Sequence, residues 1–196
     1  DLSHLTSLQN LKAINIDDNG GLSDRSFDQL AKLKNLERLY MSNCRITGAG
    51  MTFFNDPKLK HPGLKVLVAN QTQFGLLGLP NIARWKSIEE LHIAQASVND
   101  NTLGALALCP NLRVLNLGHD SFSVIGLTAA NFKAKKKLEH VSIINVKGVT
   151  DAALGLFKAN KTLKTLNLSG CSVSPAGVNQ LRKILKTTQI IADGAN

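Results

Sequence analysis

A pattern that recurs along the chain constrains the fold more than any other feature. Each copy reads apolar, two variable, apolar, one variable, apolar, two variable, then a small or amide residue, and successive copies start 24 to 28 residues apart. The seven copies are Leu11-Ile14-Ile16-Asn19, Leu36-Leu39-Met41-Cys44, Leu64-Leu67-Ala69-Thr72, Ile88-Leu91-Ile93-Ala96, Leu112-Leu115-Leu117-Asp120, Leu138-Val141-Ile143-Val146 and Leu163-Leu166-Leu168-Cys171. Chance does not supply seven copies in near register, so the pattern predicts a repeat architecture.

The spacing of apolar residues predicts the local structure of each repeat. Within a copy, apolar and variable residues alternate, which indicates a short strand. Between copies they recur three apart, as at Phe27, Leu30 and Leu33, which indicates one face of a helix. We expect helices of two to three turns, entered through N-cap residues. The predicted N-caps are Ser23, Asn99, Ser123, Thr150 and Ser174, the last followed by Pro175 in the first turn.

A unit of strand, turn and helix cannot bury both of its faces alone, so successive units must stack. We therefore predict a single α/β domain over residues 1–196: a right-handed solenoid of about seven repeats, with a parallel sheet on the concave face and helices on the convex face. Residues 1–10 and 172–196 are expected to be terminal caps, with a possible eighth strand at 189–191. The insertion at 55–63, which holds Pro57 and Pro62, predicts a protruding loop.

The repeats resemble leucine-rich repeats of the ribonuclease-inhibitor-like class. Cys44 and Cys171 at the ninth position, together with the segment Leu108-Cys109-Pro110-Asn111-Leu112, resemble the cysteine-containing subtype of F-box-associated substrate receptors. Segments 149–154 and 173–178 are similar to short repeats of bacterial proteins, especially planctomycete ones. The resemblance implies protein binding, and it leaves open a role as the substrate-receptor part of a larger F-box-like or effector protein. The sequence itself holds no F-box segment.

The variable positions of the strands supply the candidate site. They face the concave solvent side and are diverse, whereas the packing positions are strictly apolar, so we predict a non-catalytic module that binds a protein partner on this face. Arg38, Tyr40 and His92 are the expected hot spots, because Tyr and Arg are enriched among binding anchors. The predicted contact residues are Asn15, Arg38, Tyr40, Val66, Val68, Glu90, His92, Asn116, His140, Ser142 and Asn167.

The chain shows no motif for catalysis, a cofactor or a metal. The three cysteines are predicted to be buried and unpaired, since Cys44 and Cys171 are separated by about 24 Å at ~4.8 Å per strand, too far for a disulfide. Unpaired thiols favour a reducing compartment. The histidines at 92, 119 and 140 fall in different rows of the sheet, which argues against a zinc site.

The positive charge offers an alternative function. The net charge is +9, and residues 99–196 hold 12 basic and 5 acidic groups. The densest run is Lys133, Lys135, Lys136 and Lys137, which predicts a basic surface for nucleic acid or another anionic partner. Many lysines follow helix ends, where the dipole favours a cation, and only Tyr40 offers an inner-face ring for base stacking. No apolar run is long enough to span a membrane, so we expect a soluble chain.

Overall fold

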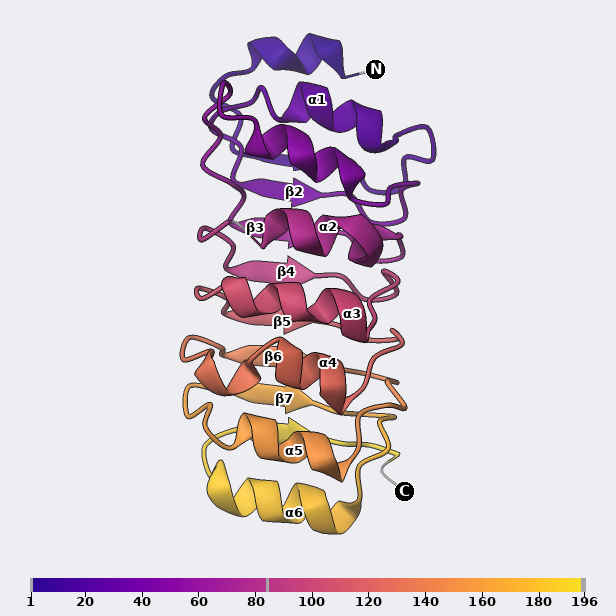
Figure 1. The fold of residues 1–196 in the computed structure, drawn as a ribbon, viewed down its shortest axis with the longest axis vertical. Helices are drawn as coiled ribbons and strands as arrows, with labels where there is room; N and C mark the ends of the chain where they lie inside the picture. Colours follow the sequence, from indigo (N-terminus) through magenta and orange to yellow (C-terminus); the bar gives the residue numbers. More distant parts are fainter. Residues whose placement is uncertain (1, 84, 195–196) are drawn as a thin grey trace.

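The computed structural model describes residues 2–83 and 85–194, and it forms an elongated stack of strand, loop and helix units (Figure 1). Within these residues, eight three-residue strands make one parallel sheet in the order β1 to β8. The strands are β1 (Ala13–Asn15), β2 (Arg38–Tyr40), β3 (Val66–Val68), β4 (Glu90–His92), β5 (Val114–Asn116), β6 (His140–Ser142), β7 (Thr165–Asn167) and β8 (Gln189–Ile191). The predicted solenoid is confirmed, including the eighth strand.

Short helices cover the side of the sheet that faces the viewer in Figure 1. They are η1 (Ser3–Ser7), η2 (Asp24–Ser26), α1 (Phe27–Leu30), η3 (Ala49–Asn55), α2 (Phe74–Ile82), α3 (Asp100–Leu103), η4 (Gly104–Leu108), α4 (Val124–Ala129), η5 (Phe132–Ala134), α5 (Asp151–Phe157) and α6 (Pro175–Ile184), where η marks a 3₁₀ helix. No helix among the described residues is long and apolar enough to cross a membrane.

The prediction of regular helices of two to three turns is wrong for several repeats. The helical segment after β2 is entirely 3₁₀, and α3 ends after four residues and continues as the 3₁₀ helix η4. Apolar residues spaced three apart suit a helix with three residues per turn, so the same pattern serves both helix types. The side chains of three predicted N-caps accept a hydrogen bond from the first turn: Asn99, Ser123 and Ser174. Ser23 forms a capping box with Ser26, whereas Thr150 makes no side-chain cap hydrogen bond.

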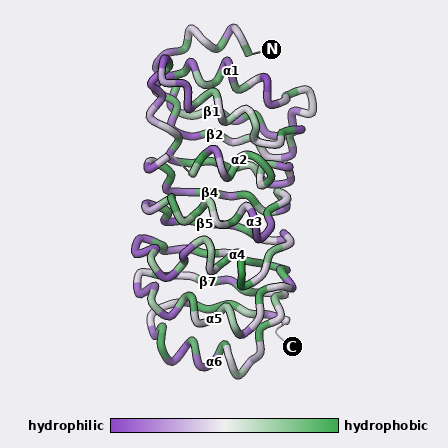
Figure 2. The backbone as a smooth tube through the Cα atoms, in the orientation of Figure 1, coloured by the Kyte–Doolittle hydropathy of each residue, from purple (hydrophilic) through white to green (hydrophobic). Residues whose placement is uncertain are grey.

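One continuous apolar core lies between the sheet and the helices. The middle residue of each strand from β2 to β8 is buried, and the phenylalanine rings of neighbouring repeats meet edge to face, as Phe132 and Phe157 do at 5.5 Å. Hydrophilic residues gather in the loops at the two edges of the stack (Figure 2). The core therefore extends along the whole solenoid, as a stack of incomplete units requires.

The three cysteines lie in this core as free thiols, as predicted. Burial raises the pKa of each thiol, to about 11 at Cys109. We expect the folded chain to react with an aromatic disulfide reagent far more slowly than the urea-unfolded chain, because the thiolate is the reactive form. Absorbance of the released thiolate measures both rates. Fast labelling of the folded chain would contradict the buried placement.

The loop at 55–63 packs back on the stack instead of protruding freely, which corrects the prediction. The ring of His61 stands edge-on against Phe54 with 4.8 Å between centroids, and Leu59 packs against the core. Trp85 Nε1 donates to Asn55 Oδ1 at 2.7 Å, which ties the start of the loop to the next repeat. The two prolines bend the loop, but its apolar and aromatic side chains decide where it lies.

Aspartates at the helix starts link successive repeats on the side where the helices begin. Asp100 Oδ1 accepts from the backbone N–H groups of Ser123 at 2.7 Å and Gly126 at 3.0 Å, and its Oδ2 accepts from the Ser123 hydroxyl at 2.8 Å. Asp24 and Asp151 make corresponding links to the next repeat. In each case a glycine follows the aspartate by 26 residues: Gly50, Gly126 and Gly177.

Candidate functional site

Two ladders of side chains run across the concave face, because the parallel register places equivalent residues side by side. The first ladder is Ala13, Arg38, Val66, Glu90, Val114, His140, Thr165 and Gln189, and the second is Asn15, Tyr40, Val68, His92, Asn116, Ser142, Asn167 and Ile191. Alternate residues of a strand face the same side. All eleven predicted contact residues therefore lie on one face, and β8 adds Gln189 and Ile191, which the sequence analysis left out.

Several of these side chains already hydrogen-bond to the backbone of the chain itself. Three asparagines of the second ladder use Oδ1 to accept the backbone N–H two residues later, which shapes the turn after the strand. These pairs are Asn15 with Asp17, Asn116 with Gly118, and Asn167 with Ser169, at 2.8, 3.2 and 3.0 Å. Such asparagines retain their Nδ2 groups and one lone pair of Oδ1 for a partner.

Other polar groups of the first ladder are paired within the chain. His140 Nδ1 lies 2.8 Å from Thr165 Oγ1, and Glu90 Oε1 accepts from Arg113 at 3.3 Å. In contrast, the side chains of Arg38, Tyr40 and His92 make no hydrogen bond with the part of the chain that the structure describes. Burial lowers the pKa of His92, and the nearby Glu90 opposes this only in part, so the ring is neutral at pH 7.

The three side chains without a hydrogen bond lie on neighbouring strands, among two valines and Glu90. We call this cluster the β2–β4 patch, and it consists of Arg38, Tyr40, Val66, Val68, Glu90 and His92. Val66 pairs with Arg38 on one side and with Glu90 on the other, while Val68 lies between Tyr40 and His92. Two valines thus form an apolar centre between an aromatic ring, a cation and a neutral imidazole. Buried apolar area with Tyr and Arg anchors is typical of protein-binding surfaces.

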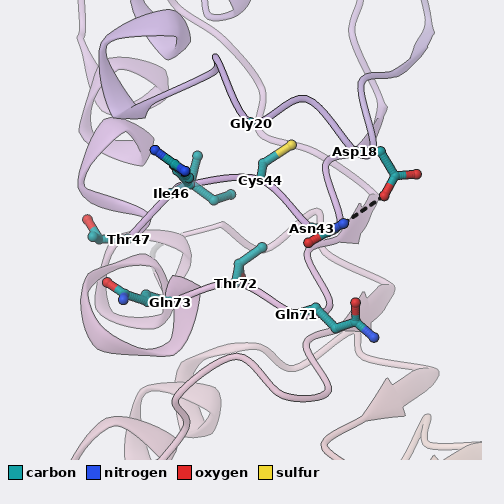
Figure 3. Close-up of a pocket in the computed structure, with 10 residues that line it drawn as sticks. Asp18, Gly20, Asn43, Cys44, Ile46, Thr47, Gln71, Thr72 and Gln73 are labelled. Atoms are coloured by element: carbon teal, nitrogen blue, oxygen red, sulfur yellow. Dashed lines mark hydrogen bonds between the residues drawn. The ribbon is translucent and has the colours of Figure 1, made fainter.

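A hollow of about 680 Å³ lies where the strands β1 to β3 lead into the loops before the helices (Figure 3). Asp18, Asn43 and Gln71 stand there in left-handed backbone conformation, with φ of 61°, 55° and 53°. Asn43 Nδ2 donates to Asp18 Oδ1 at 2.9 Å. The hollow is lined by Asp18, Gly20, Asn43, Cys44, Arg45, Ile46, Thr47, Gln71, Thr72 and Gln73.

The sequence analysis missed this hollow. The available signal was the eighth position of each repeat, where Asp and Asn tolerate the left-handed conformation better than other side chains. The lining is mainly amide and hydroxyl groups, which can hydrogen-bond a polar ligand. Cys44 faces inward, donates to the carbonyl of Ile16 at 3.2 Å and has a pKa raised by burial, which disfavours the reactive thiolate.

The histidines do not form a common site. His92 and His140 lie in different ladders, and His119 follows β5 in left-handed conformation, 3.4 Å from Asn145 Nδ2. Among residues 2–83 and 85–194, no three His, Cys, Asp or Glu side chains converge in a way that could hold a metal ion.

The predicted basic run is split by the structure. Lys133, Lys136 and Lys137 are exposed, but Lys135 is 3% exposed and its ammonium donates to the carbonyls of Leu106 and Cys109 at 2.5 and 3.1 Å. These carbonyls end the helical segment of the preceding repeat and have few other partners. Burial lowers the pKa of Lys135. The prediction that Lys135 belongs to an anion-binding surface is therefore wrong.

The fold and the ladders define this protein as a leucine-rich repeat solenoid. Two family models described as Leucine Rich Repeat match residues 35–56 and 159–179. Internalin C2 from Listeria monocytogenes superimposes with a TM-score of 0.70 at 19% identity, over 94% of this chain and 72% of that one. The internalin inlF from the same organism gives 0.68 at 17% identity, over 100% of this chain and 58% of that one. No curated protein sequence matches significantly.

At these identities the likeness shows the fold alone. The chain spans less than two thirds of the length of one of these structures. The leucine-rich repeats are confirmed, while the ribonuclease-inhibitor-like, cysteine-containing subtype and the planctomycete likeness stay predictions.

Proposed function

We propose that the chain is a non-catalytic module that captures a protein partner on its concave face, with the β2–β4 patch as the centre of the interface. The observation that carries the proposal is the set of side chains in this patch that make no hydrogen bond to any other described residue: Arg38, Tyr40 and His92. They surround two valines on a rigid sheet whose backbone groups are paired, so binding orders few new groups.

The size of the face supports the same function. Eight strands at ~4.8 Å span about 34 Å, which with the rims provides the roughly 800 Å² per partner of an ordinary specific interface. The groups that line the hollow in Figure 3 add hydrogen-bonding capacity at one margin of this face.

The double variant Arg38→Ala with Tyr40→Ala tests the proposal. We expect the dissociation constant for the captured partner to rise at least about tenfold, because anchors of these types contribute the most to binding. The melting temperature should change little, since neither side chain has a hydrogen-bond partner among the described residues. Proteins captured from the source extract by the immobilised chain are identified, purified and titrated calorimetrically.

Gln189→Ala with Ile191→Ala is the matched control, because both residues lie in the same two ladders at the far end of the sheet and neither is a predicted contact residue. It should bind as the unmodified chain does. Equal affinity for the Arg38 and Tyr40 double variant, or an equal loss in the control, would move the interface away from the β2–β4 patch. Failure to capture any protein would contradict the function itself.

A further inference from the structure

Exposed lysines line the edge at which the last three strands begin. We call them the lysine strip, and they lie at the ends of η5, α5 and α6 and in the loops that follow these helices, on the left edge in Figure 1. All eight are exposed: Lys133, Lys136, Lys137, Lys158, Lys161, Lys164, Lys183 and Lys186. The buried Lys135 is not part of the strip.

The strip runs along the long axis of the solenoid. Lys133, Lys158 and Lys183 follow one another at 25 residues, and so do Lys136, Lys161 and Lys186. That interval equals the register of β6 with β7, in which His140 pairs with Thr165, and differs by one residue from that of β7 with β8, in which Thr165 pairs with Gln189. Lys161 Nζ also reaches the carbonyl of Ile184 at 3.4 Å, which places the loop after α5 against the end of α6. Corresponding lysines of successive repeats are therefore neighbours in space.

The charge of the strip is largely uncompensated. Glu139 is the one acidic residue in its three loops, and it already pairs with Lys164 at 2.7 Å and Arg113 at 3.1 Å. Lys136 and Lys137 donate instead to neutral oxygens, at 3.2 and 2.6 Å. Lys133, Lys158, Lys183 and Lys186 have no ion-pair partner among the described residues.

A neighbouring row of charged residues on the same edge is balanced in sign. The residues just before the strands alternate in sign and are joined by backbone hydrogen bonds from each repeat to the one before: Lys12, Glu37, Lys65, Glu89, Arg113, Glu139 and Lys164, the last of which also belongs to the strip. Lys65 and Glu37 form an ion pair at 3.1 Å. In the earlier repeats, Asp28 of α1 pairs with Lys32 at 2.9 Å, and Asp56 follows η3 close to Lys58.

The helix dipole explains a cation at each helix end, worth ~0.3 to 1 kcal/mol. It does not explain the near absence of acids across three adjacent loops, where like charges repel one another. Surplus charge on a narrow strip instead raises the local concentration of an anionic ligand. The strip is one loop wide and three repeats long, which suits a linear polyanion better than a planar membrane.

We propose that the lysine strip binds the phosphate backbone of duplex DNA without reading its sequence. Arg182 lies beside Lys183, but its guanidinium already donates to Asn179 Oδ1 at 3.1 Å and to the carbonyl of Ile190 at 2.9 Å, which leaves the lysines as the main free cations. Lysine contacts phosphate as a point charge, whereas arginine is the usual residue for bidentate recognition of carboxylates and of guanine. The strip contains no aromatic residue on which the bases of a single strand could stack. Contacts to phosphates alone match this composition.

The triple variant Lys133→Glu, Lys158→Glu and Lys183→Glu tests the proposal with a short mixed-sequence DNA duplex. We expect affinity to fall at least about tenfold, and the slope of log affinity against log salt to shrink by about three, one for each lost phosphate contact. Fluorescence anisotropy over a series of salt concentrations measures both. The control triple is Lys34→Glu, Lys58→Glu and Lys86→Glu, which makes the same charge change on the same edge of earlier repeats and should bind nearly normally.

Equal losses in the two triples would assign binding to net charge and overturn the strip as a site, as would unchanged binding in the strip triple. Tighter binding of a sulfated polysaccharide or of anionic vesicles, with no competition by the duplex, would assign the strip to another ligand class and also overturn the proposal. Circular dichroism checks folding, and Lys→Gln at the same three positions replaces the strip triple if it unfolds. The Arg38 and Tyr40 double variant should bind DNA normally, so the two proposals fail separately.

Discussion

Asp120→Asn is expected to raise the free energy of unfolding at pH 7 by about 1 to 3 kcal/mol. Asp120 occupies the ninth position of its repeat and is buried. Its Oδ1 accepts from the backbone N–H groups of Ala96 and Val98, both at 3.0 Å, but its buried Oδ2 has no partner among the described residues. An amide would keep the acceptor and replace the orphan oxygen with a donor.

In other repeats, the side chain at the ninth position donates a hydrogen bond to a backbone carbonyl. Asn19 Nδ2 donates to the carbonyl of Ile16 at 3.0 Å, and Thr72 Oγ1 donates to that of Ala69 at 2.7 Å. Cys171 Sγ donates to the carbonyl of Ile143 at 2.9 Å. Each residue thus gives a hydrogen to the end of a strand, which an ionised carboxylate cannot do.

The burial of Asp120 also predicts that the free energy of unfolding depends on pH. Burial raises the pKa of Asp120 to about 6, against an ordinary 3.8, although backbone hydrogen bonds from Val98, Ala96 and Ser97 oppose the rise. The folded state therefore holds the proton more tightly than the unfolded state. The stabilisation is fully present below about pH 4 and is lost as the pH rises through 6, to a total of about 3 kcal/mol.

Urea unfolding at several pH values measures this contribution. The difference in stability between Asp120→Asn and the unmodified chain should grow from pH 4 to pH 7, because only the unmodified chain carries the ionising group. Asp193→Asn, at an exposed position, is the control and should show no such trend. A variant that is less stable than the unmodified chain at pH 7 would mean that Oδ2 accepts a hydrogen bond in solution.

The sequence predicts the sheet well because each strand obeys a local rule. Alternation around a central apolar residue identifies the concave ladders down to the residue, and it also identifies Ile190 at the end of the stack. No local rule predicts the burial of Lys135, because it lies in the densest lysine run. Its burial is favourable because the ammonium donates to the carbonyls of Leu106 and Cys109, which lie 29 and 26 residues earlier in the chain. The paired groups of the candidate site, such as His140 with Thr165, also depend on contacts between repeats.

The link between aspartate and glycine is likewise invisible to a search within one repeat. Asp24, Asp100 and Asp151 look like ordinary first-turn acids, which helix dipoles favour. Their partners lie in the following repeat, so only a comparison at an interval of 26 residues connects them. The stack is therefore held partly by polar links that alternate with apolar packing along the solenoid.

The largest loss of stability is expected at such a link, in Asp100→Ala. The variant leaves three donors of the next repeat without their acceptor: the N–H groups of Ser123 and Gly126 and the Ser123 hydroxyl. Burial raises the pKa of Asp100, but hydrogen bonds from Ser123 and Gly126 outweigh this and keep it below its ordinary value, so the carboxylate is ionised. Hydrogen bonds to a charged group contribute more than neutral ones, and we expect a loss of about 2 to 4 kcal/mol.

Asp28→Ala is the control, because Asp28 forms an exposed ion pair with Lys32 on its own helical turn and should cost less than about 1 kcal/mol. A second comparison isolates the link. A Cβ on Gly126 would lie 2.6 Å from Asp100 Oδ1, so Gly126→Ala is destabilising while the carboxylate is present. In the Asp100→Ala background that contact is gone, and the double variant should be more stable than the sum of the two single losses implies. Strict additivity in urea unfolding would show that the carboxylate and the glycine do not act as one unit.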